Sequence, residues 1–326
     1  MTSPLPPLAD LHCHLEAVTT PLMARKLAKR HAIDVSRLFT ETGEYAWSTF
    51  EDFLSVYDAM ARVIRTPEDY HDITADHLAA AAREGVIYAE VFVSADHAAG
   101  VGLSFGDMIA AVGDAMDAAE AAGGPIARMV ATSVRHYGAA KAEAAARLAA
   151  EADHPRLTGF GIAGDEAFGA PRDFARAFDI AREAGLGLTA HAGEICGPES
   201  VRAALEWLKP ARLGHGVRAI EDPSLLAELA ARGVVLEVCP TSNIAIGLYS
   251  GWAAHPLPDL IKGGARVALG SDDPAFFGAS IGDEYRRAGE AFAFGHADLA
   301  GITRTAIAAA FCDEPTKTGL LARLSA

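Results

Sequence analysis

The sequence predicts an α/β protein, a (β/α)8 TIM barrel with a helical insertion after strand 1 that covers the barrel mouth. Eight short apolar or β-branched runs alternate with helical stretches, as parallel strands with crossover helices do. The first run leads into His12-Cys13-His14, where an open doubly wound sheet, the main alternative, would need a glycine-rich phosphate loop. Since such barrels take about 250 residues before insertions, we expect residues 1–326 to form a single domain.

The predicted strands and helices follow one another along the chain. The strands are expected at residues 8–11, 86–93, 129–134, 157–163, 186–190, 212–214, 234–238 and 267–270. Segments rich in Ala, Leu, Arg and Glu are typical of helices, and they lie at residues 105–122, 139–152, 171–184, 199–208 and 223–232. Gly85, Gly185 and Gly233 each follow a helical segment, and glycine at that position favours the end of a helix.

A long segment at about residues 20–83 interrupts this alternation between the first two strands. It holds three helical patterns, at residues 21–31, 49–63 and 67–83, and a concentration of aromatic side chains: Tyr45, Trp47, Phe50, Phe53 and Tyr57. These side chains fit either an ordinary apolar helix face or a lid over an aromatic ligand. Because the segments that follow barrel strands surround the mouth, we expect the insertion to lie over it.

The composition favours a small-molecule ligand. With 43 acidic against 28 basic residues the net charge is −15, which argues against binding of nucleic acid or of an anionic membrane. No signal peptide is visible, and no apolar stretch approaches about 18 residues. The four cysteines are scattered and form no Cys-x-x-Cys pair. We therefore expect a cytoplasmic protein, and the sequence leaves its oligomeric state open.

Residues that can bind a metal lie at the ends of several predicted strands. His12 and His14 are two residues apart, and on a strand both imidazoles point to the same side. His191, His215 and the pair Asp272-Asp273 follow later strands. All strand ends face one mouth in a barrel, so these side chains should converge. Three imidazoles and one carboxylate suit zinc with an open position for water, which is typical of a catalytic site.

Five motifs, in chain order, resemble the adenosine deaminase family, whose members act on adenosine, adenine or AMP and which belongs to the metal-dependent amidohydrolase superfamily. The motifs are His12-x-His14, His191-Ala-Gly-Glu194, Gly214-His215-Gly216, Cys239-Pro-Thr-Ser-Asn243 and Ser271-Asp272-Asp273-Pro274. A further block, residues 159–166, ends in Ala-Gly-Asp-Glu and is similar to the family's strand-four motif. The resemblance spans essentially the whole chain.

The resemblance implies a role for each of these residues. One zinc ion per chain would be bound by His12, His14, His191 and Asp272. The catalytic residues would be Glu194, His215 and Asp273, and the substrate would contact His14, Glu16, Gly164 and Asp273. The implied reaction is the hydrolysis of an amino group from a purine ring.

The residue types suit these roles. Zinc lowers the pKa of a bound water, and His215 can orient that water or take its proton. Glu194 can donate a proton to the ring nitrogen next to the reacting carbon, so that negative charge does not build up on the ring. Asp273 can hydrogen-bond the other ring nitrogen and fix the orientation of the base.

Two departures from the family pattern concern the substrate. Adenosine-specific members usually continue with Leu-Asp-Gly after the second histidine, and this chain has Leu15-Glu16-Ala17. Gly161 stands where the strand-four motif commonly has an aspartate. The intact Ala-Gly-Asp-Glu block favours adenosine and 2′-deoxyadenosine, with Glu16 accepting a hydrogen bond from the ribose. The alternatives are adenine and the 5′-modified nucleosides aminodeoxyfutalosine, 5′-methylthioadenosine and S-adenosylhomocysteine.

Other function classes fit less well. Binuclear members of the superfamily typically bridge two metals with a carboxylated lysine after strand four, and residues 156–166 contain no lysine. A degenerate metal-binding scaffold without catalysis would have no need of Glu194, His215 and Asp273. A zinc hydrolase of substituted pyrimidines would not need the glycine block that is expected to hold a purine.

Overall fold

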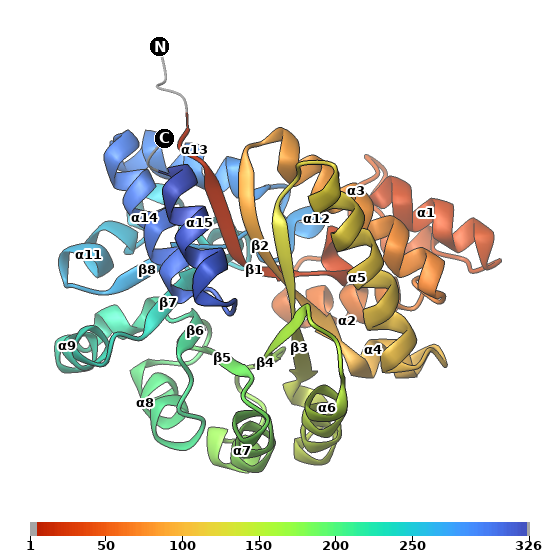
Figure 1. The fold of residues 1–326 in the computed structure, drawn as a ribbon, viewed down its shortest axis with the longest axis horizontal. Helices are drawn as coiled ribbons and strands as arrows, with labels where there is room; N and C mark the ends of the chain where they lie inside the picture. Colours follow the sequence, from red (N-terminus) through yellow and green to blue (C-terminus); the bar gives the residue numbers. More distant parts are fainter. Residues whose placement is uncertain (1–4, 325–326) are drawn as a thin grey trace.

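The computed structural model describes residues 5–324, which form the expected (β/α)8 barrel (Figure 1). The eight strands are parallel and lie in chain order. They are β1 (Leu8–His14), β2 (Val86–Ser94), β3 (Ile126–Val134), β4 (Leu157–Ala163), β5 (Gly187–Ala192), β6 (Arg212–His215), β7 (Val235–Val238) and β8 (Arg266–Leu269). All eight predicted strands are confirmed, with ends that differ by three residues or fewer. Their inner and outer faces are both covered, so most of their side chains are buried and apolar.

The two ends of the sheet meet through residues just past β8. The amide of Asp272 donates to the carbonyl of His12 at 2.7 Å, and the amide of His14 donates to the carbonyl of Asp272 at 2.9 Å. These bonds form an isolated parallel bridge between Cys13 and Asp272. The barrel therefore closes at the residues that the sequence analysis singled out as metal ligands.

Helices surround the strands (Figure 1). The larger ones on the outside are α3 (Pro67–Arg83), α5 (Phe105–Ala121), α6 (Ala139–Glu151), α7 (Ala175–Glu183), α8 (Pro198–Trp207), α9 (Pro223–Arg232), α13 (Ile281–Phe292), α14 (His296–Ala309) and α15 (Glu314–Leu324). Short helices lie in the loops: α4 (Ala95–Gly100), α10 (Pro240–Ala245), α11 (Leu257–Lys262) and α12 (Pro274–Phe277). The sequence analysis predicted no element after residue 270. There α14 packs on β1 and β8 and closes the outer layer.

The segment predicted as an insertion, about residues 20–83, contains α1 (Pro21–Arg30), η2 (Ser36–Leu38), α2 (Phe50–Ala61) and α3, and η1 (Glu16–Val18) precedes it. α3 packs along α5 and against β2, so it belongs to the outer layer of helices. α2 lies at the mouth, where its aromatic rings pack on Phe276 of α12: Phe53 edge-on at 5.5 Å and Tyr57 stacked at 5.6 Å. The same two rings also line the pocket below. They therefore belong both to the hydrophobic core and to the lid over the pocket.

Within residues 5–324, no helix has the length and apolar character needed to cross a membrane.

Candidate active site

The four predicted metal ligands come together at the closed edge of the barrel. The ligand atoms of His12, His14, His191 and Asp272 all lie within 4.8 Å of one another. Nε2 of His14 is 3.3 Å from Nε2 of His191, and Oδ1 of Asp272 lies 3.3 Å from Nε2 of His12 and 3.5 Å from that of His14. Nε2 of His12 is buried and makes no hydrogen bond within the described part of the chain. This donor set, with a buried nitrogen left unsatisfied, fits a metal ion.

The charges around this cluster also favour a cation. Burial lowers the pKa of His14 to about 3 and that of His191 well below its usual value, so both imidazoles are neutral, as metal ligands must be. Burial also disfavours a charged His12, but the nearby carboxylates of Asp272 and Glu237 outweigh this and raise its pKa to about 10. The two carboxylates thus favour a positive charge beside His12, and a metal ion bound there by a neutral imidazole would provide it.

A buried ion network supports His12 from below. Its Nδ1 lies 2.8 Å from Oε2 of Glu237, which fixes the ring so that Nε2 faces the cluster. Glu237 also accepts a hydrogen bond from Nε of Arg212 at 2.5 Å. Nη2 of the same guanidinium donates to Glu90 at 2.5 Å. All three side chains of this network are fully buried, and Arg212 also stacks over the ring of Phe311 at 3.5 Å.

Glu194 lies in a loop that a second carboxylate holds. Glu166, at the end of the strand-four motif, accepts hydrogen bonds at 2.6–3.0 Å from the backbone N–H groups of residues 193–196. The Ser200 hydroxyl donates to the same carboxylate. Burial, reinforced by the negative charges of Asp272 and Glu166, raises the pKa of Glu194 well above its usual range. This shift favours the protonated form of Glu194, which is the form that a proton donor needs.

Asp273 and Gly164 both line the pocket. Oδ1 of Asp273 is buried and has no hydrogen-bond partner within residues 5–324, so it is available to a ligand. Burial and the charge of Asp272 raise the pKa of Asp273 well above its usual range.

Gly164 has φ of +94°, and a Cβ there would lie 2.9 Å from the ring of His136, so only glycine fits this position.

His215 lies beside the cluster. Its Nε2 is 3.5 Å from Oε1 of Glu194 and 3.9 Å from Oδ2 of Asp272. Both His215 and Asp272 have the left-handed backbone conformation, with φ of +59° and +60°. This conformation is costly for residues other than glycine, and such strain concentrates at functional sites.

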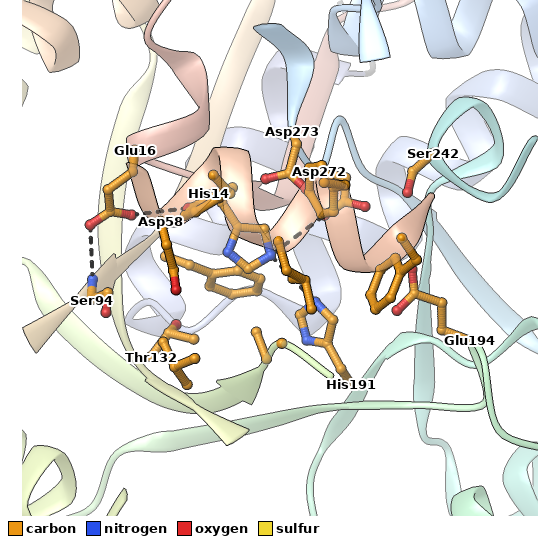
Figure 2. Close-up of a pocket in the computed structure, with 18 of the residues that line it drawn as sticks. His14, Glu16, Asp58, Ser94, Thr132, His191, Glu194, Ser242, Asp272 and Asp273 are labelled. Atoms are coloured by element: carbon orange, nitrogen blue, oxygen red, sulfur yellow. Dashed lines mark hydrogen bonds and ion pairs between the residues drawn. The ribbon is translucent and has the colours of Figure 1, made fainter. Parts of the chain in front are cut away.

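The pocket continues from the metal cluster towards the lid (Figure 2). Glu194 lies on one side of His14, and Glu16, Asp58 and Ser94 lie on the other. Glu16 is 1% exposed, and its carboxylate accepts hydrogen bonds from the hydroxyls of Tyr57 and Tyr70 and from the amide of Ser94, at 3.3–3.4 Å.

His97 closes this end of the pocket. Nε2 of His97 bonds Oδ1 of Asp58 at 3.1 Å, and its Nδ1 lies 3.9 Å from Oε1 of Glu16. Nδ1 is buried and otherwise without a hydrogen-bond partner in the described chain.

All the site residues expected from the sequence lie at this pocket or its metal cluster. The sequence analysis missed residues that hold them in place: Glu237, Arg212, Asp58, Tyr70 and His97. For Glu237 the sequence did hold a signal: it is the one acidic residue in the otherwise apolar strand Val235–Val238, where a buried carboxylate needs a partner. Asp58, Tyr70 and His97 carried no such signal, because they come from helices whose positions the strand pattern does not fix.

Comparison with known proteins decides the family. The model of the adenosine deaminase family matches residues 7–326. This chain belongs to that family. It is therefore a deaminase, a hydrolase that acts on carbon–nitrogen bonds in cyclic amidines.

Several relatives over nearly the whole chain are named adenine deaminase. Those of Agrobacterium fabrum and of Chelativorans sp. are 48% and 49% identical to this chain over 316 residues, covering 97% of each chain. The solved structure of an adenine deaminase from Arthrobacter aurescens superposes with a TM-score of 0.89 at 30% identity, covering 98% of both chains.

A zinc-bound amidohydrolase from Burkholderia ambifaria also has a TM-score of 0.89, at 28% identity, covering 98% of this chain and 90% of that one. Together with the His/Asp cluster, this similarity supports a metal cofactor.

Proposed function

We propose that this protein is a zinc-dependent adenine deaminase, which converts adenine and water to hypoxanthine and ammonia. The sequence favours adenosine first, with adenine and 5′-modified nucleosides as alternatives. The names of the relatives at 45–49% identity support adenine better. Adenosine is therefore replaced by adenine as the proposed substrate.

The position of Glu16 is the structural observation that carries this proposal. Its carboxylate already accepts from two tyrosine hydroxyls and one backbone amide. An ionised carboxylate has about four acceptor sites, so three donors of its own protein leave Glu16 at most one for a ligand. We therefore assign Glu16 to the wall of the pocket, and the ribose contact expected of it from the sequence stays an untested prediction.

The polar groups at the lid end suit a free base. For hydrolysis, the amino-bearing carbon of the purine must face the metal cluster, so the opposite end of the ring faces Glu16, Asp58 and His97. A free base presents an N–H at N9, whereas a nucleoside carries ribose there. The Asp58 carboxylate can accept that N–H, and we expect the wall formed by Glu16, Asp58 and His97 to exclude a ribose at N9.

We assign one zinc ion to His12, His14, His191 and Asp272, with His14 also close to the substrate. Zinc would supply a water that is reactive at neutral pH. Glu194 donates a proton to N1 of the ring, and its raised pKa keeps that proton available. Asp273 bonds N7 through Oδ1, which makes no hydrogen bond within residues 5–324, and the amide of Gly164 holds the remaining edge of the purine. His215 acts on the attacking oxygen.

The test is the product analysis of the purified protein. With adenine we expect equal amounts of hypoxanthine and ammonia, and elemental analysis should give about one zinc per chain. Adenosine and 2′-deoxyadenosine at equal concentration should react far more slowly. Faster release of ammonia from adenosine would overturn the choice of substrate, and two tightly bound metals per chain would overturn the assignment of the metal site.

A further inference from the structure

A chain of buried hydrogen bonds leads from a backbone amide to His215. The residues involved are His255, which precedes α11, and Asn243, near the end of α10; they are 3% and 0% exposed. The amide of Leu257 donates to Nδ1 of His255 at 3.2 Å. Nε2 of His255 is 3.2 Å from Oδ1 of Asn243, and Nδ2 of Asn243 is 3.2 Å from Nδ1 of His215. The last atom, Nε2 of His215, faces Glu194 and Asp272 across the pocket.

The first bond fixes the direction of all the others. A backbone N–H can only donate, so Nδ1 of His255 is an acceptor. Burial lowers the pKa of His255 to about 3, so the ring is neutral and its one proton is on Nε2. That N–H must meet the oxygen of Asn243, because the reversed amide would place two donors against each other. The NH2 group of Asn243 consequently donates to Nδ1 of His215.

We infer that Asn243 and His255 are positioning residues that hold His215 in the tautomer with its proton on Nε2. His215 then presents an N–H, rather than a lone pair, to the attacking oxygen. It orients that oxygen and stabilises negative charge on it, and it does not take its proton. The sequence left both roles open for His215, and the hydrogen-bond chain selects the first. This inference depends on the proposed function only where its kinetic tests use adenine as the substrate.

The tautomer can be observed without any assay of activity. The metal-loaded protein would be labelled with ¹⁵N-histidine, and long-range ¹H–¹⁵N correlation spectra would be recorded, with the His215 signals assigned from His215→Gln. We expect an unprotonated Nδ1 and a protonated Nε2 for His215. A proton on Nδ1 of His215 in the wild-type protein would overturn the inference.

The variant Asn243→Asp tests the same point by chemistry. The substitution keeps the shape of the side chain, but a carboxylate can only accept, so it requires a proton on Nδ1 of His215. We expect this change in the ¹⁵N spectrum and a fall in kcat for adenine of about 10²- to 10³-fold, as for the loss of one donor to an oxyanion. KM should change less than about threefold, because the residue does not touch the substrate.

A pair of substitutions at His255 separates positioning from a merely structural role. Glutamine places an N–H near the position of Nε2 and keeps the bond to Asn243, whereas leucine removes it. His255→Gln should therefore recover most of the kcat that His255→Leu loses, with equal zinc content and equal melting temperature in both variants. Equal kcat in His255→Gln and His255→Leu, or an Asn243→Asp variant that keeps wild-type kcat while folded and loaded with zinc, would overturn the inference. If the wild-type protein released no ammonia from adenine, the proposed function would fail, and the spectrum would still decide the tautomer.

Discussion

The two halves of the pocket are built in different ways. In the metal half, the side chains come from the ends of β1, β5, β6 and β8, and hydrogen bonds of the closing sheet fix their positions. In the lid half, Glu16, Tyr57, Asp58, Tyr70 and His97 come from η1, α2, α3 and α4, and they hold one another through side-chain contacts. The strand ends thus carry the chemistry, while the helices after β1 and β2 decide what fits beside it.

The largest effect is expected from a change in the metal half that leaves the lid half intact. Glu194→Gln removes the proton that we assign to N1 of the ring, so kcat for adenine should fall by about 10²- to 10⁴-fold. Zinc content and binding of hypoxanthine should persist, since Glu194 is not among the metal ligands. Glu206→Gln, an exposed position on α8, is the matched control and should keep the wild-type rate. A near-normal rate in Glu194→Gln would remove this residue from the mechanism.

The next effect tests the network under the metal half. Arg212→Met leaves Glu90 and Glu237 buried without their cation, which should cost about 3–5 kcal/mol in the free energy of unfolding. Chemical denaturation measures this loss, with Arg266→Met at the exposed start of β8 as the control. Because Glu237 also holds His12, the affinity for zinc should fall as well. A loss below about 1 kcal/mol would show that the network does not stabilise the barrel.

The smallest effect concerns the lid half and depends on pH. Burial lowers the pKa of His97, but its hydrogen bond to Asp58 and the charges of Glu16, Asp58 and Asp96 outweigh this, and the pKa is raised above 6.5. A raised pKa in the folded state adds stability that is complete below about pH 6.5 and is lost as the pH rises through the folded value. The rings of Tyr57 and Tyr137 also pack on His97.

Asp58→Asn should therefore destabilise the protein by about 1 kcal/mol at pH 6, since the pair is partly exposed, and by less at pH 9. Glu51→Gln, at an exposed position of the same helix, should show no such dependence. Equal destabilisation of Asp58→Asn at both pH values would mean that the His97–Asp58 contact does not depend on a charged histidine.

The same division explains what could be predicted from the sequence. The eight strands and the convergence of His12, His14, His191 and Asp272 follow from periodicity and from the rule that strand ends of a barrel share one mouth. The pairing of Glu16 with Tyr57 and Tyr70 could not be predicted, because it depends on how α2 and α3 pack, 41 and 54 residues further along the chain. From the sequence, Glu16 is expected to contact the ligand. In the structure, its carboxylate accepts hydrogen bonds from Tyr57, Tyr70 and the amide of Ser94.

The most direct test of the account is a comparison of kcat/KM for adenine, 9-methyladenine and adenosine in one assay of ammonia release. The three substrates share the reacting end and differ only at N9, which faces the lid half. If this half accepts the N9–H and excludes a sugar, adenine should exceed adenosine by at least about 100-fold, and 9-methyladenine should also react more slowly than adenine. Equal or greater kcat/KM for adenosine would contradict the account, because the lid half would then have room for the ribose.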